Sequence, residues 1–253
     1  MYKIYPKTLF LGQKIQYLPS CQSTNDEAAT LIAHTDPVEG TLVITDNQVA
    51  GRGQRGNQWE AESGQNLTSS LILKPTFLSA NEQFWLNIAI SLGIYDGLQP
   101  LVGNTLCIKW PNDIYAGDKK LGGLLIENTL HGYNIAWSVA GIGLNINQTE
   151  FSYPTATSLQ QEAPLPDAYN VPGLLSRLCE TLEQRYLQLR SGHRDTLKVN
   201  YLQILYRYQE EHLFRSGEQY FRGMIVGVDD TGRLAIATGE QIRYFDFKEV
   251  SFL

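Results

Sequence analysis

The chain has little of what disulfide-bonded, metal-binding and membrane proteins need. Its three cysteines, Cys21, Cys107 and Cys179, are odd in number and far apart, so the sequence indicates neither a disulfide framework nor a zinc ribbon. The four histidines are isolated and lack the spacing of a metal site. No stretch approaches the roughly 18 apolar residues of a membrane helix, and the N-terminus lacks the pattern of a secretory signal. We therefore expect a cytoplasmic protein that holds no metal with its own side chains and has no membrane partner.

Positive charge is also scarce. The 20 Lys and Arg residues face 26 Asp and Glu residues, which gives a formal net charge of −6. Proteins that bind nucleic-acid phosphates usually carry the opposite balance, so we expect no nucleic-acid partner and only a local anion site. With 253 residues, 43% of them hydrophobic, the chain can form one large domain or one domain with a small appendage.

The order of predicted elements favours an α+β fold, in which a mixed sheet lies beside helices and a small all-β unit follows. We divide the chain into a catalytic unit, 1–210, and a β unit, 211–253. Within the catalytic unit, the composition of the glycine-rich segment 50–66 predicts a mobile loop. Strands are predicted at 15–19, 41–45, 67–73, 106–110, 114–115, 121–126, 135–140, 220–228, 233–237 and 241–247, and helices at 23–34, 79–98, 174–189 and 196–208.

The run Gly51-Arg52-Gly53-Gln54-Arg55-Gly56 matches G-x-G-x-x-G, yet no helix is predicted directly after it. A dinucleotide-binding motif needs that helix, so we reject this interpretation. Glycines let a backbone wrap around an anion, and guanidinium groups neutralise it through paired hydrogen bonds. The alternative is a solvated loop whose arginines have no ligand.

A second cluster is Lys109-Trp110-Pro111-Asn112-Asp113, where a predicted strand ends at a proline. A hairpin turn at 116–118 brings Lys120 back toward Asp113 or its neighbour Tyr115. The alternative is an ordinary surface ion pair. Gly122-Gly123 follows inside the strand and indicates close approach of a ligand or of another backbone.

The third cluster, Gly141-Ile142-Gly143-Leu144-Asn145-Ile146-Asn147, alternates small and apolar residues. It could form the floor under a flat ring whose edge the amides bind, or simply a bulged strand end.

In their order and spacing these clusters resemble those of the biotin protein ligases, together with Ser23-Thr24-Asn25, Gln48, Trp59, Asn66-Leu67 and Glu127. The resemblance spans residues 23–147, and the β unit fits the SH3-like domain of that family. It implies a sheet like that of class II aminoacyl-tRNA synthetases, followed by a small SH3-like β-barrel.

The resemblance also implies an activity: such ligases convert biotin and ATP to biotinyl-5′-AMP, with Mg²⁺ on the phosphates, and transfer biotin to a lysine of a biotin carboxyl carrier domain. It implies catalytic roles for Arg52, Lys120 and Asp113. The implied biotin-binding residues are Ser23, Thr24, Asn25, Gln48, Gly51, Arg52, Gly53, Gln54, Lys120, Gly123 and Gly141. The implied adenylate-binding residues are Arg55, Trp59, Lys109, Asn112 and Asn145.

Two departures from the family pattern matter. Many members have Arg in place of Gln54, at a position tied to holding the adenylate. Some members carry an N-terminal DNA-binding domain, for which the 22 residues before Ser23 are too few, so we expect no operator binding. Alternatives are a lipoate or octanoate ligase and a non-catalytic biotin sensor, and both a monomer and a homodimer stay open.

Overall fold

The computed structural model describes residues 3–54 and 58–253. A seven-stranded mixed sheet forms its centre, with the strand order β1-β2-β3-β7-β6-β5-β4. β1 and β2 pair in parallel and the other neighbours are antiparallel. Its strands are β1 (Ile15–Cys21), β2 (Leu42–Gln48), β3 (Leu67–Leu73), β4 (Leu106–Lys109), β5 (Asp113–Ala116), β6 (Lys119–His131) and β7 (Asn134–Leu144).

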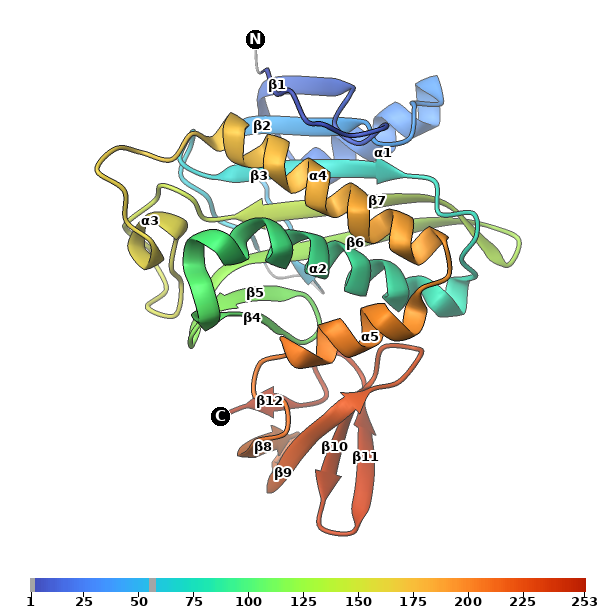
Figure 1. Cartoon of the computed structure of the whole chain (residues 1–253), viewed down its shortest axis with the longest axis vertical. Helices are drawn as coiled ribbons and strands as arrows, with labels where there is room; N and C mark the ends of the chain where they lie inside the picture. Colours follow the sequence, from blue (N-terminus) through green and yellow to red (C-terminus); the bar gives the residue numbers. More distant parts are fainter. Residues whose placement is uncertain (1–2, 55–57) are drawn as a thin grey trace.

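Helices cover both faces of this sheet. The long helices α2 (Gln83–Val102) and α4 (Val171–Arg190) lie across one face (Figure 1). α1 (Thr24–Thr35) packs on the other, where Ala28 meets Val43, Ile72 and Val139 in a separate apolar cluster. Neighbouring strand residues join the main core instead, as expected when side chains alternate between the faces.

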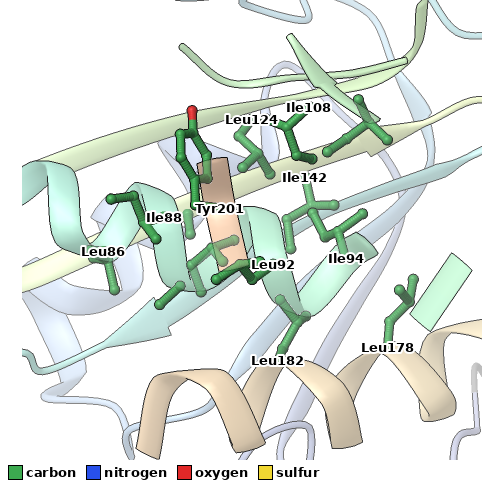
Figure 2. Packing of buried hydrophobic residues seen from close by; sticks show 14 of the residues in the cluster. Leu86, Ile88, Leu92, Ile94, Ile108, Leu124, Ile142, Leu178, Leu182 and Tyr201 are labelled. Atoms are coloured by element: carbon green, nitrogen blue, oxygen red, sulfur yellow. The ribbon is translucent and has the colours of Figure 1, made fainter. Parts of the chain in front are cut away.

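The main core lies between the sheet and the two long helices. Figure 2 shows α2 residues such as Leu92 and Ile94 between the strand residue Ile142 and Leu182 of α4. These side chains are at most 3% exposed. Their burial fixes the sheet as a rigid base, from which the loops at the strand ends form the site.

The C-terminal residues form a second, five-stranded antiparallel sheet in the order β11-β10-β9-β8-β12. In Figure 1 it lies below α5 (Arg194–Gln203). It contacts the first unit where Trp110 Nε1 donates to the Gly232 carbonyl at 2.9 Å and the Trp110 ring packs on Phe247. The strands are β8 (Glu211–Ser216), β9 (Gln219–Val228), β10 (Leu234–Thr238), β11 (Gln241–Phe245) and β12 (Ser251–Phe252).

The mixed α+β architecture is as predicted, and several local predictions were wrong. The helix predicted at 196–208 ends at Gln203, because the chain then pairs with the free edge of β4 through an Ile108–Leu205 bridge. β8, β12 and the short helix α3 (Leu159–Glu162) were not predicted. In the segment 50–66, the described residues form no α-helix and one isolated bridge, between Arg52 and Gln58. Residues 55–57 lie outside the description.

Candidate functional site

A cavity of about 760 Å³ lies between the end of β4, the start of β5, the first half of β6, the last residues of β7 and the C-terminal β12. Its lining residues range along the sequence from Ser23 to Phe252. The predicted site residues that line it are Ser23, Thr24, Asn25, Gln48, Arg52, Gly53, Gln54, Trp59, Lys109, Asn112, Asp113, Lys120, Gly123 and Gly141.

Asp113 and Lys120 form an ion pair in the wall, with 2.7 Å between Oδ1 and Nζ. The predicted hairpin positions them, because Asp113 begins β5 and the antiparallel register places it opposite Gly123 of β6. A β-bulge after Ile114 turns Lys120 back toward the carboxylate. Both side chains are about one-third exposed, so they remain accessible to a ligand.

Arg52 lines the cavity from the glycine-rich segment. Its Nη2 lies 2.6 Å from Asp26 Oδ1, in the first turn of α1, and 3.2 Å from Glu127 Oε2 on β6. Two carboxylates from separate elements therefore hold this guanidinium.

Buried polar side chains form the part of the wall beside α1. Gln48 Oε1 accepts from the Thr24 backbone N–H at 2.8 Å, and Ser70 Oγ bonds both Thr24 Oγ1 at 2.7 Å and Asn25 Oδ1 at 2.6 Å. Asn25 Nδ2 donates to Glu127 Oε2 at 2.6 Å. Each of these amides and hydroxyls has a fixed partner, so the wall presents a defined pattern of donors and acceptors.

Trp59 lies against the floor formed by β7. A Cβ on Gly143 would come within 2.6–2.9 Å of the indole ring, so only glycine permits this contact. The indole Nε1 is buried and has no hydrogen-bond partner among the residues that the structure describes. Asn112 donates from Nδ2 to the Leu124 carbonyl.

Lys109 is enclosed by aromatic rings. Its Nζ is 3.2 Å from the Tyr115 hydroxyl and lies over the rings of Tyr115, Tyr206 and Phe252, at 4.7, 5.7 and 5.2 Å from the ring centroids. Burial lowers the pKa of this ammonium, and the nearby Asp113 carboxylate opposes that shift. Since Tyr115, Tyr206 and Phe252 come from β5, a connecting segment and β12, Lys109 also joins the two sheets.

Family models match both parts of the chain. Residues 17–145 match the Biotin/lipoate A/B protein ligase family, and residues 213–253 match the Biotin protein ligase C terminal domain. The bifunctional ligase/repressor BirA of Bacillus subtilis (strain 168) is 31% identical over 243 residues, covering 94% of this chain and 73% of its own length. The chain belongs to the biotin protein ligase family.

Other relatives agree with this family assignment. A biotin--[acetyl-CoA-carboxylase] ligase of Mycobacterium tuberculosis is 31% identical over 226 residues, covering 86% of this chain and 80% of its own length. The fold resembles that of the Aquifex aeolicus biotin protein ligase, solved in complex with biotin and ATP. That structure gives a TM-score of 0.77 at 24% identity, with 94% of this chain and 98% of the other covered.

Several lining residues were not predicted from the sequence, and some of them come from the second sheet. The C-terminal segment supplies Lys248, Val250, Ser251 and Phe252. No motif indicated these residues, because they lie far from the other motifs in the sequence and only the folded structure brings them to the cavity. The remaining lining residues outside the predicted set are Gln58, Thr68, Ser69, Trp110, Pro111, Leu124, Leu125, Ile142, Gly143, Tyr153 and Thr155.

Two of the predicted residues that the structure describes are not among the lining. Gly51 lies beside the cavity, in an adjoining hollow next to Gln48 and Trp59. Asn145 is buried, and its Nδ2 donates to the Thr157 carbonyl at 2.9 Å, so it fixes the segment after β7. Arg55 lies outside the described residues. Their proposed ligand contacts stay predictions.

The lining is locally cationic although the chain is acidic overall. Of the lining residues that the structure describes, Arg52, Lys109, Lys120 and Lys248 are cationic and Asp113 alone is acidic, while Asp26 and Glu127 pair with Arg52 from beside the cavity. The excess of cations suits anionic ligands. Among residues 3–54 and 58–253, no three metal-binding side chains cluster. Within the same ranges no helix has both the length and the apolarity to cross a bilayer.

Proposed function

We propose that the protein activates biotin with ATP and transfers it to a lysine of a biotin carboxyl carrier domain. The observation that carries this proposal is the cavity in which Arg52, Lys120 and Asp113 meet, in a chain of the biotin protein ligase family. The acceptor suggested by the mycobacterial relative's name is acetyl-CoA carboxylase. We further propose that the unit 1–210 has the class II synthetase-like sheet and that 211–253 is SH3-like.

In the first step a carboxylate oxygen of biotin attacks the α-phosphorus of ATP. The bond from that phosphorus to the bridging oxygen of the β-phosphate breaks, and pyrophosphate leaves. Two anions must approach each other, so cations that hold both lower the barrier by positioning and by charge stabilisation. Arg52 and Lys120 do this here, and Mg²⁺ held on the ATP phosphates would supply further charge stabilisation.

In the second step the uncharged ε-amine of the carrier lysine attacks the acyl carbon of biotinyl-5′-AMP. The bond from this carbon to the AMP oxygen breaks, AMP leaves and the amine loses a proton. Asp113 orients the amine and accepts that proton. Its ion pair with Lys120 keeps the carboxylate at the reacting end of the cavity.

The polar wall supports the following assignment of ligand positions. Thr24 and Gln48 bind the ureido ring through the ordered polar network, with Ser23 and Asn25 beside them. Three residues of the glycine-rich segment, Gly51, Gly53 and Gln54, are assigned to biotin as well. The backbone at Gly123 and Gly141 lines the biotin pocket. The residues assigned to the adenylate are Trp59, Asn112, Asn145, Lys109 and Arg55.

Pyrophosphate release tests the first step and separates biotin from its rivals. With MgATP we expect release on addition of biotin, and no release with lipoate or octanoate. Lys120→Ala should lower the rate at least about 100-fold, the typical effect of one lost charge-stabilising group. Lys119→Ala, the neighbouring exposed lysine on β6, is the control and should keep the wild-type rate. Release with lipoate or octanoate alone would move the protein to those relatives.

A further inference from the structure

The contacts of Arg52 leave part of its guanidinium unused. Both carboxylates, Asp26 and Glu127, bond the same nitrogen, Nη2. Among the described residues Nη1 and Nε have no hydrogen-bond partner. A guanidinium carries five N–H groups, and both of its parallel pairs include Nη2. With Nη2 bonded to the two carboxylates, the N–H groups of Nη1 and Nε each stay available for a single hydrogen bond at the cavity.

Glu127 also connects Arg52 to the polar wall. Its Oε2 accepts from Asn25 Nδ2 at 2.6 Å as well as from Arg52. Asn25 is in turn bonded to Ser70, and Ser70 to Thr24. One carboxylate oxygen therefore sets the position of the arginine relative to the residues assigned to the ureido ring.

The geometry points to orientation rather than stability as the purpose of these ion pairs. The side chains of Arg52, Asp26 and Glu127 are 45%, 55% and 42% exposed. Ion pairs exposed to this degree contribute little to the free energy of unfolding. They nevertheless restrict a long, flexible side chain, so less freedom is lost when a ligand binds.

We propose that Asp26 and Glu127 are positioning residues, which hold the Arg52 guanidinium so that its remaining N–H groups bind the carboxylate of biotin. This inference rests on the proposed function and adds two acidic residues to a site otherwise selected for anions. Removing either negative charge frees the arginine and weakens the binding of the biotin anion, although the variants become more positively charged.

The test compares biotin with its neutral analogue biotinamide, which has the same ring and side chain without the carboxylate charge. Dissociation constants are measured by calorimetry for the full-length wild type, Glu127→Gln and Asp26→Asn. Gln at position 127 keeps an oxygen that can accept from Asn25, so this variant chiefly removes the charge facing Arg52. Glu27→Gln is the matched control, because it removes a neighbouring charge in the first turn of α1 that forms no ion pair among the described residues.

We expect Glu127→Gln to weaken biotin binding about tenfold and Asp26→Asn about threefold, with biotinamide affinity unchanged within twofold. The midpoint of thermal unfolding should stay within about 2 °C. Glu27→Gln should bind both ligands as the wild type does. Unchanged biotin affinity in Glu127→Gln and Asp26→Asn, or equal weakening for biotin and biotinamide, would overturn the positioning role. If the wild type binds biotin but releases no pyrophosphate, the proposed function fails, and the biotin-to-biotinamide comparison still decides this inference. A wild type that does not bind biotin overturns both.

Discussion

A methyl group added at Gly141 should disrupt the polar wall of the site. Its Cβ would lie 2.5 Å from Asn25 Oδ1, where real Cβ atoms essentially never come closer than 3.0 Å, so the two must separate by about 0.5 Å. Asn25 cannot simply move away, because Ser70, the Leu125 carbonyl and Glu127 hold it on three sides. The strain therefore falls on buried, hydrogen-bonded atoms.

The expected magnitude follows from two contributions. Overpacking a well-packed site costs about 1–3 kcal/mol, and a weakened buried hydrogen bond adds about 1 kcal/mol. Gly141→Ala should lower the free energy of unfolding in urea by about 2–4 kcal/mol and weaken biotin binding. Gly227→Ala on β9 is the control, since its Cβ meets nothing within 4 Å, and should stay within about 0.5 kcal/mol. If Gly141→Ala proved as stable as Gly227→Ala and bound biotin normally, the reasoning about Asn25 would be wrong.

Three further predictions concern single carboxylates and the glycine-rich segment. The Ser79 N–H bond, supported by Arg194, lowers the pKa of Glu82 from its ordinary 4.5. The stability that the ionised Glu82 contributes is therefore present above about pH 4.5 and is lost as the pH falls through the lowered pKa. The free energies of unfolding in urea of Glu82→Gln and the wild type should differ at pH 7 and become equal in acid. Glu183 accepts the backbone N–H groups of Leu9, Phe10 and Leu11, so Glu183→Gln should lower the free energy of unfolding by about 1–3 kcal/mol. The control Glu218→Gln, at an exposed position, should change it by under about 0.5 kcal/mol. Gln54→Arg adds a cation to the cavity wall, so biotinyl-5′-AMP should dissociate up to about fivefold more slowly in a chase experiment, and an unchanged rate would remove Gln54 from adenylate binding.

Local pattern predicted the parts of the fold that depend on neighbouring residues. Alternation and turn residues located most central strands, and the hairpin at 116–118 correctly brought Lys120 to Asp113. Gly122-Gly123 predicted close approach of a ligand or of another backbone, and a Cβ on Gly122 would lie only 2.5 Å from the Gly143 carbonyl oxygen. These predictions succeeded because hairpin register and glycine contacts follow from short stretches of sequence.

Contacts between segments far apart in the chain could not be predicted from the sequence. The sequence does not show that Asp26 and Glu127 share one nitrogen of Arg52, since three separate elements meet there. The contribution of Lys248 and Phe252 to the cavity depends on how the second sheet docks on Trp110. The helix predicted at 196–208 ends at Gln203, because the unpaired edge of β4 competes for the backbone hydrogen bonds of the residues that follow.

The most direct test of the account is the intact mass of a biotin carboxyl carrier domain after incubation with the protein, biotin and MgATP. The account predicts a gain of one biotinyl group that requires ATP, is lost with Lys120→Ala and is retained with Lys119→Ala. A carrier that stays unmodified while neither biotin, lipoate nor octanoate triggers pyrophosphate release would contradict the ligase assignment and favour a non-catalytic biotin sensor.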